Sequence, residues 1–239
     1  MFVNYAHRGA SQYRPENTMI SFLYGIDLGA NGIELDLQKT KDGKVVIFHD
    51  EIIDKKSNGK GKILDYTYEE LLQMDFGAWK GEEFKGTKIC LFEDFAKEFL
   101  AKDLTFAIEI KAENLEKEAL EIIYRYKKHD NIYISSFSFS ILENVRKLDK
   151  EIKISWLITG SIDQEKIDKL LAVNGAQICP EAEQATEEGV RLAESNGLGV
   201  RLWGVYNEDI MKESFPLAHE GMTVNFPDKL VEYLKTQNK

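Results

Sequence analysis

Residues 132–159 read IYISSFSFSILENVRKLDKEIKISWLIT, and this stretch carries the pattern that decides the fold. Short runs of apolar and β-branched residues at 132–137 and 153–159 predict strands, and the apolar spacing at 138–148 predicts a helix between them. A strand, a helix and a second strand within about thirty residues are typical of a parallel sheet with helical crossovers. The same unit recurs from one end of the chain to the other.

The recurrence amounts to eight strand–helix pairs in 239 residues, with no linker between them. A repeat of this number and length predicts a closed (β/α)₈ barrel, and we expect residues 1–239 to form one such domain. The predicted strands are 3–8, 32–40, 105–111, 132–137, 153–159, 176–179, 200–205 and 222–225. The predicted helices are 17–29, 91–101, 115–128, 138–148, 163–173, 186–196, 207–217 and 227–236.

One unit breaks the rhythm after the second strand. Asp42 and Gly43 predict a tight turn into a hairpin strand at 44–50, and about forty residues then pass before the next regular helix. We interpret 51–89 as a small insertion with a helix at 68–74, placed at the barrel mouth because it directly follows His49 and Asp50. We expect it to be an ordered cap, because its aromatic residues can form a cluster: Tyr66, Tyr68, Phe76, Trp79 and Phe84.

Composition and charge exclude several classes of protein. The chain is 43% hydrophobic and 30% charged with a net charge of −10, which disfavours disorder and general binding to nucleic acids or anionic membranes. No apolar run approaches the roughly 20 residues that span a bilayer, so we expect no stable membrane insertion. Cys90 and Cys179 are isolated thiols, which favours a reducing, cytoplasmic location. No pattern indicates an oligomeric state.

Charged residues cluster at the predicted strand ends that meet at the barrel mouth. His7 and Arg8 end the first strand, although a lone histidine such as His7 could equally satisfy a backbone carbonyl. Glu34 and Asp36 lie two apart on the second strand and therefore face the same side. The third strand adds a second pair with this spacing, and the hairpin returns a second imidazole to the same rim: Glu109 and Lys111, then His49.

Burial of three carboxylates without a cation would cost several kcal/mol each. Because oxygen ligands without cysteine favour Mg²⁺ or Ca²⁺ over Zn²⁺, Glu34, Asp36 and Glu109 predict one such divalent ion. The ion, Arg8 and Lys111 could neutralise the oxygens of a phosphodiester. One imidazole could then remove a proton from the nucleophile while the other protonates the leaving alkoxide.

The order and spacing of these motifs resemble the glycerophosphodiester phosphodiesterase family over nearly the whole chain. The matching stretches are His7-Arg8-Gly9, Pro15-Glu16-Asn17-Thr18, Glu34-Leu35-Asp36, His49-Asp50, Asn58-Gly59-Lys60-Gly61, Glu69-Glu70-Leu71 and Glu109-Ile110-Lys111.

The resemblance implies a TIM barrel with a small insertion that hydrolyses glycerophosphodiesters to an alcohol and sn-glycerol 3-phosphate, in lipid and glycerol metabolism. It implies that Glu34, Asp36 and Glu109 carry the metal and that His7 and His49 are the acid–base pair. It further implies substrate-binding roles for four residues: Arg8 and Lys111 near the phosphate, Glu16 supporting the site and Trp203 lining the substrate groove.

Two other functions fit the same residues. One is a lyase-type transfer in which a hydroxyl of the substrate attacks and a cyclic phosphate is released. The other is a catalytically silent barrel that only binds a phosphate ligand. Within the insertion, Lys55 and Lys56 replace the more usual Arg-Thr of the family. They either attract anionic headgroups or are simply solvated.

Overall fold

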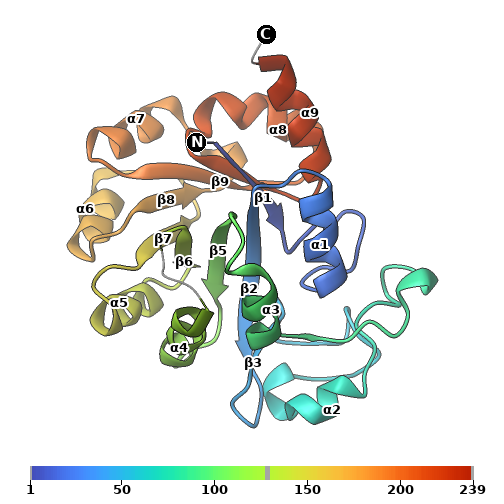
Figure 1. Cartoon of the computed structure of the whole chain (residues 1–239). Helices are drawn as coiled ribbons and strands as arrows, with labels where there is room; N and C mark the ends of the chain where they lie inside the picture. The colour runs from blue at the N-terminus through green and yellow to red at the C-terminus, as the bar shows by residue number, and fades with distance from the viewer. Residues whose placement is uncertain (1, 127–129, 238–239) are drawn as a thin grey trace.

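The computed structural model describes residues 2–126 and 130–237. Within these residues, eight parallel strands form a closed barrel, because β1 pairs with β2 on one side and β10 on the other. Figure 1 shows the helices arranged around the strands. The predicted (β/α)₈ barrel is confirmed. Its strands are β1 (Val3–His7), β2 (Gly32–Lys39), β5 (Thr105–Ile110), β6 (Ile132–Ser136), β7 (Lys153–Ile158), β8 (Gln177–Pro180), β9 (Gly199–Val205) and β10 (Gly221–Val224).

The helices follow the strands as the sequence pattern predicted. They are α1 (Met19–Asp27), α3 (Phe92–Phe99), α4 (Glu116–Tyr126), α5 (Phe139–Leu148), α6 (Gln164–Ala172), α7 (Glu187–Ser195), α8 (Glu208–Ser214) and α9 (Pro227–Gln237). The prediction for 207–217 was too long, since the α-helix ends at Ser214 and residues 215–217 form a 3₁₀ turn that contains Pro216. Positions 127 and 128 of the predicted helix 115–128 lie outside the described residues.

The apolar core lies between the outer face of the barrel and the helices. On β2 the side chains of Ile33, Leu35 and Leu37 are fully buried in this layer. Glu34 and Asp36 alternate with them and must therefore face the barrel interior, because successive residues of a strand point to opposite sides. The alternating pattern that buries the apolar side chains of β2 in the core thus also places the two carboxylates in the barrel interior.

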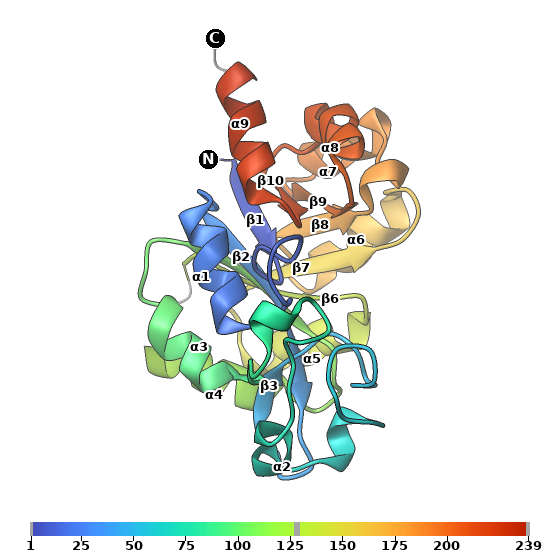
Figure 2. The ribbon, with the colours of Figure 1, turned by 90° about the vertical axis from the view of Figure 1, so that its right-hand side faces the viewer.

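The insertion extends the sheet beyond the barrel. β3 (Val45–Ile47) runs antiparallel to β2, and β4 (Cys90–Leu91) pairs with β3. Residues 51–89 connect them through two 3₁₀ turns and α2 (Tyr68–Leu72), which begins with a capping box between Thr67 and Glu70. In Figure 2 this segment lies at the opposite end of the molecule from α9.

The insertion has a small apolar cluster of its own. Its buried members are Val46, Phe48, Ile53, Ile63, Leu71, Phe76 and Ile89. The predicted aromatic cluster is therefore only partly correct: Phe76, Tyr66 and Tyr68 take part, but Trp79 and Phe84 do not belong to this cluster. The predicted helix 68–74 also ends two residues early, at Leu72, where the chain enters a turn held by the Asp75 carboxylate.

Among the described residues, no helix is both long and apolar enough to cross a lipid bilayer. Both cysteines are free and buried.

Candidate active site

The predicted site residues meet at the carboxyl ends of the barrel strands. Strand register explains why, because His7 on β1 is the direct partner of Glu34 on β2, and Asp36 is the direct partner of Glu109 on β5. His49 follows β3, the strand that returns along β2. A cavity of ≈ 260 Å³ opens here, and its lining includes His7, Arg8, Glu34, His49, Glu109 and Trp203.

Three carboxylates form a compact cluster in this mouth. One oxygen from each of Glu34, Asp36 and Glu109 lies within 4.8 Å of the others, and all three residues are buried. Oδ1 of Asp36 has no hydrogen-bond partner, and the Nζ atom of Lys111 is 3.8 Å away from it. A buried, unsatisfied carboxylate oxygen beside two further carboxylates is a set of donors that fits a hard divalent cation.

The cluster is electrostatically strained without such a cation. Burial and the neighbouring Asp36 raise the pKa of Glu34 well above its ordinary value, and the same causes raise the pKa of Glu109 to about 7. Burial would also raise the pKa of Asp36, but Arg8, His49 and Lys111 hold it below its ordinary range. A bound cation would favour the ionised form of all three groups, since it places positive charge where they repel one another.

Each histidine is oriented by a hydrogen bond at Nδ1. Nδ1 of His7 donates to Oδ1 of Asn225 at 2.6 Å, and Nδ1 of His49 lies 2.6 Å from Oδ1 of Asp50. Both rings therefore present Nε2 as the atom free to exchange a proton. Burial and the Arg8 guanidinium lower the pKa of His7 to about 4, so its ring is neutral at pH 7.

The two predicted phosphate-binding cations are held by carboxylates. Nε of Arg8 is 3.1 Å from Oδ2 of Asp36, and Nη1 donates to Oε1 of Glu16 at 2.9 Å. Nζ of Lys111 donates to Oε1 of Glu109 at 2.9 Å. Glu16 itself lies outside the cavity lining, so its place in the site depends on Arg8. These ion pairs place both positive charges beside the carboxylate cluster.

An apolar wall faces the charged side of the cavity. The indole N–H of Trp203 is bonded to the backbone oxygens of Ile158 and Cys179, which fixes the ring at the end of β9. Phe137 meets this ring edge-on, with 5.0 Å between the centroids. The wall contains the predicted Trp203 and three residues that the sequence analysis did not select: Phe137, Leu157 and Tyr206.

Three polar residues of the site were also missed. Asn17 donates its amide to Oδ2 of Asp36 at 2.8 Å, and Asn225 orients His7. Arg201 is fully buried at the cavity and bonds Thr223, while its Nε and Nη2 atoms have no hydrogen-bond partner. Asn225 follows β10 directly, so the position of strand ends could have identified it. Asn17 lies in the family stretch Pro15-Glu16-Asn17-Thr18, which could have identified it, whereas nothing in the sequence pattern separates Arg201 from ordinary polar residues.

The expectation that Lys56 is simply solvated is wrong, whereas its effect on headgroup choice stays a prediction. Its Nζ donates to Oε2 of Glu16 at 2.8 Å and lies 3.9 Å from the ring centroid of Trp79. The ammonium is therefore partly covered and engaged by an ion pair and an aromatic ring. Lys55 is exposed, and it lines a shallow hollow next to the site together with His49 and Lys111.

Comparisons with known proteins agree with this geometry. The model of the glycerophosphoryl diester phosphodiesterase family matches residues 7–229. The chain belongs to this family. It is 32% identical over 235 residues to a glycerophosphodiester phosphodiesterase of Caldanaerobacter subterraneus subsp. tengcongensis, covering 96% of both chains. Membership places it among the phosphoric diester hydrolases.

Two solved phosphodiesterase structures have the same fold. A phosphodiesterase of Oleispira antarctica, in complex with the product sn-glycerol-3-phosphate, aligns with a TM-score of 0.88 and 25% identity over 97% of this chain and 96% of its own. A glycerophosphodiester phosphodiesterase of Thermotoga maritima aligns with a TM-score of 0.78 and 26% identity over 98% and 99% of the two chains.

Proposed function

We propose that this protein hydrolyses glycerophosphodiesters to an alcohol and sn-glycerol 3-phosphate with the help of one divalent cation, Mg²⁺ or Ca²⁺. The observation that carries the proposal is the meeting of a buried carboxylate cluster and two oriented histidines in one cavity. Its family relatives support the substrate class, because they include a protein named for this activity and a structure with this product.

The cation would be held by Glu34, Asp36 and Glu109, and it would neutralise charge on the phosphoryl oxygens. Arg8 and Lys111 lie beside this cluster and would add positive charge to the same region. Trp203 would line the substrate groove, where its ring is fixed by two backbone oxygens. Glu16 would support the site through Arg8.

The two histidines would divide the proton transfers. His7 is neutral and its Nδ1 is occupied by Asn225, so Nε2 is suited to take the proton of the attacking water. His49 is held at Nδ1 by the Asp50 carboxylate, which orients its ring, so its Nε2 is suited to give a proton to the leaving alkoxide. The phosphorus–oxygen bond to the alcohol breaks, and the new bond is to the water oxygen.

A panel of glycerophosphodiesters, assayed with Mg²⁺, with Ca²⁺ and with a chelator, tests class and cation together. Phosphorus NMR of the quenched reaction identifies the product. We expect sn-glycerol 3-phosphate, formed only with a divalent cation. A cyclic phosphate would instead support the transferase alternative, and retained ligand without turnover would support a silent binding protein. Full turnover after exhaustive chelation would contradict the requirement for a divalent cation.

We also infer a cytoplasmic location, because Cys90 and Cys179 are both buried as free thiols. Cell fractionation with an antibody to the protein tests this inference.

A further inference from the structure

The loop between β1 and α1 carries residues of the site in an unusual backbone conformation. Arg8 has φ of 54° and Asn17 has φ of 57°, a left-handed region that is uncommon for residues other than glycine. Both side chains contact the same carboxylate, Asp36. Conformations of this kind persist where the surrounding structure holds them in place. The contacts that hold this loop therefore help to fix the positions of Arg8 and Asn17 beside Asp36.

A row of alternating charges runs from the carboxylate cluster to the insertion. Asp36 contacts Arg8 at 3.1 Å, Arg8 contacts Glu16 at 2.9 Å, and Glu16 contacts Lys56 at 2.8 Å. The exposed fractions of the four side chains are 1%, 17%, 14% and 24% in that order. Pairs this sheltered from water are less screened than surface pairs, so each member constrains the next.

Lys56 is the end of this row and the point at which the insertion joins it. The aromatic face of Trp79 supports its ammonium from the other side. Burial would raise the pKa of Glu16, but Arg8 and Lys56 together hold it below its ordinary value. Without Lys56, the half-buried Glu16 carboxylate would keep one ion pair within the described structure, the pair with Arg8.

Other contacts fix the insertion against the same loop. Nζ of Lys80 donates to the backbone oxygen of Ser11 at 2.7 Å. The Arg14 guanidinium lies between two rings, 4.2 Å from the centroid of Tyr24 on α1 and 5.2 Å from that of Phe84 in the insertion. The loop is thus held by the insertion at several points, and among these contacts of the described residues the Lys56 ion pair is the one made with a direct partner of Arg8.

We propose that Lys56 is a positioning residue, which holds Glu16 and through it fixes the Arg8 guanidinium beside the carboxylate cluster. The insertion then contributes to the reaction by ordering the β1–α1 loop. The expected effect of Lys56 on turnover rests on the proposed function. The expected effect of Lys56 on the order of the loop is independent of that function. Contact of Lys56 with a headgroup is not part of the proposal, because the residue does not line the ≈ 260 Å³ cavity.

The test replaces Lys56 with Met, which keeps a chain that can pack on Trp79 but removes the charge. Lys85→Met is the matched control, since Lys85 also donates at 2.8 Å to a glutamate of the insertion, Glu82, but has no link to the loop. For Lys56→Met we expect a loss of about tenfold in kcat/KM, the scale of one charge-assisted hydrogen bond. For Lys85→Met we expect less than a twofold change.

A second measurement reports loop order without substrate. The N–H of Asn17 is bonded to the carbonyl of Arg8, and that of Arg8 to the carbonyl of Glu34, both at 2.9 Å. Hydrogen exchange at these two amides should accelerate in Lys56→Met and stay unchanged in Lys85→Met, while the melting temperatures of both variants remain close to that of the wild type. Lys56→Arg should restore slow exchange and most of kcat/KM.

A double-mutant cycle with Glu16→Gln separates positioning from general destabilisation. In the Glu16→Gln background, adding Lys56→Met should cause little further loss, because the carboxylate that transmits the effect is gone. Independent, additive losses would overturn the proposal, as would a Lys56→Met enzyme that matches Lys85→Met in turnover or in exchange. If the wild type cleaves no glycerophosphodiester, the proposed function fails, and the exchange rates alone decide whether Lys56 orders the loop.

Discussion

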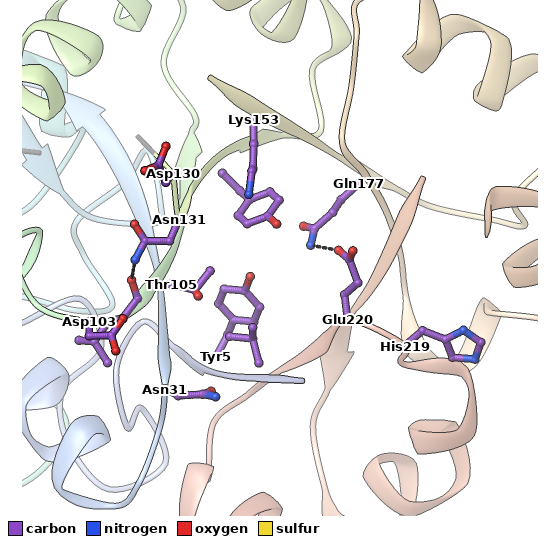
Figure 3. A pocket seen from close by; sticks show the side chains of 13 residues that line it. Tyr5, Asn31, Asp103, Thr105, Asp130, Asn131, Lys153, Gln177, His219 and Glu220 are labelled. Atoms are coloured by element: carbon purple, nitrogen blue, oxygen red, sulfur yellow. Dashed lines mark hydrogen bonds between the residues drawn. The ribbon is translucent and has the colours of Figure 1, made fainter. Parts of the chain in front are cut away.

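The two ends of the barrel both contain cavities, but they differ in how their charges are arranged. The larger cavity, ≈ 430 Å³, lies at the amino-terminal end of the strands (Figure 3), whereas the mouth cavity is ≈ 260 Å³. In the larger one the Glu220 carboxylate accepts a hydrogen bond from Gln177, and the Lys153 ammonium lies 5.0 Å from a tyrosine ring centroid. Each of these two charges therefore has a favourable partner.

The mouth instead brings three carboxylates close together, with Arg8 and Lys111 beside them. Within the described residues, Glu34, Asp36 and Glu109 are the one group of three potential ligands close enough to share a cation. The comparison teaches that the presence of a cavity does not by itself locate the chemistry of this protein. The chemistry is located by converging carboxylates, one of which has a buried oxygen without a hydrogen-bond partner, because such an arrangement is costly unless a ligand or ion completes it.

A fully buried pair of residues separates the two cavities. Tyr5 lines the amino-terminal cavity and Arg201 lines the mouth, and the guanidinium carbon lies 5.2 Å from the centroid of the tyrosine ring. A substitution in the mouth cavity can therefore be compared with a chemically similar substitution in the amino-terminal cavity as its control.

The largest expected difference is between two glutamate substitutions, one at the mouth and one at the amino-terminal end of the barrel. Glu109→Gln should lose measurable Mg²⁺ or Ca²⁺ binding in calorimetry and most of kcat, roughly 10²- to 10³-fold, because it removes one ligand and one charge that stabilises the cation. Glu220→Gln, at the other end, should bind the cation as the wild type does. Equal cation affinity in both variants would show that the carboxylate cluster is not the cation site.

The next difference concerns the histidines. His7→Ala and His49→Ala should each lower kcat by about 10²- to 10⁴-fold, the scale of general acid–base catalysis, with the fold intact by circular dichroism. His219→Ala is the control, since His219 lines the amino-terminal cavity and pairs with Glu194. Near-normal kcat in a folded His7 or His49 variant would remove that residue from the mechanism.

Arg8→Lys should have a smaller but clear effect. Arg8 uses two different nitrogens to contact Asp36 and Glu16, and a lysine has a single nitrogen in place of this planar fork. We expect kcat/KM to fall by about 10- to 100-fold, and Lys153→Met at the other end to leave it within twofold. Unchanged kcat/KM in Arg8→Lys would exclude a role for the fork.

The smallest effect is expected for Tyr5→Phe. The Tyr5 side chain is fully buried and its hydroxyl has no hydrogen-bond partner, so removing that oxygen should stabilise the fold by about 1 kcal/mol. Calorimetry should then record a rise of roughly 2–4 °C in the melting temperature, with kcat unchanged. A fall in melting temperature would contradict this prediction and reveal a hydrogen-bond partner for the hydroxyl in solution.

The sequence alone predicted the barrel, its eight strands, the insertion and the residues that converge at the mouth. It could do so because each signal is local: alternation places Glu34 and Asp36 opposite Leu35, and a parallel sheet brings all strand ends to one rim. His7, His49, Glu109 and Lys111 needed no more than their positions at the ends of strands. Their functional roles stay predictions until the variants are measured.

Only the tertiary structure decided what the remaining polar residues do. Asn17, Asn225 and Arg201 reach the site through side-chain directions that no periodicity encodes, and Lys56 contacts Glu16, which lies 40 positions earlier in the chain. The physical reason is that an ion pair or a hydrogen bond depends on distances of about 3 Å between atoms. Sequence spacing fixes such distances within one strand or helix, but across a packed interface they are fixed by the fold as a whole.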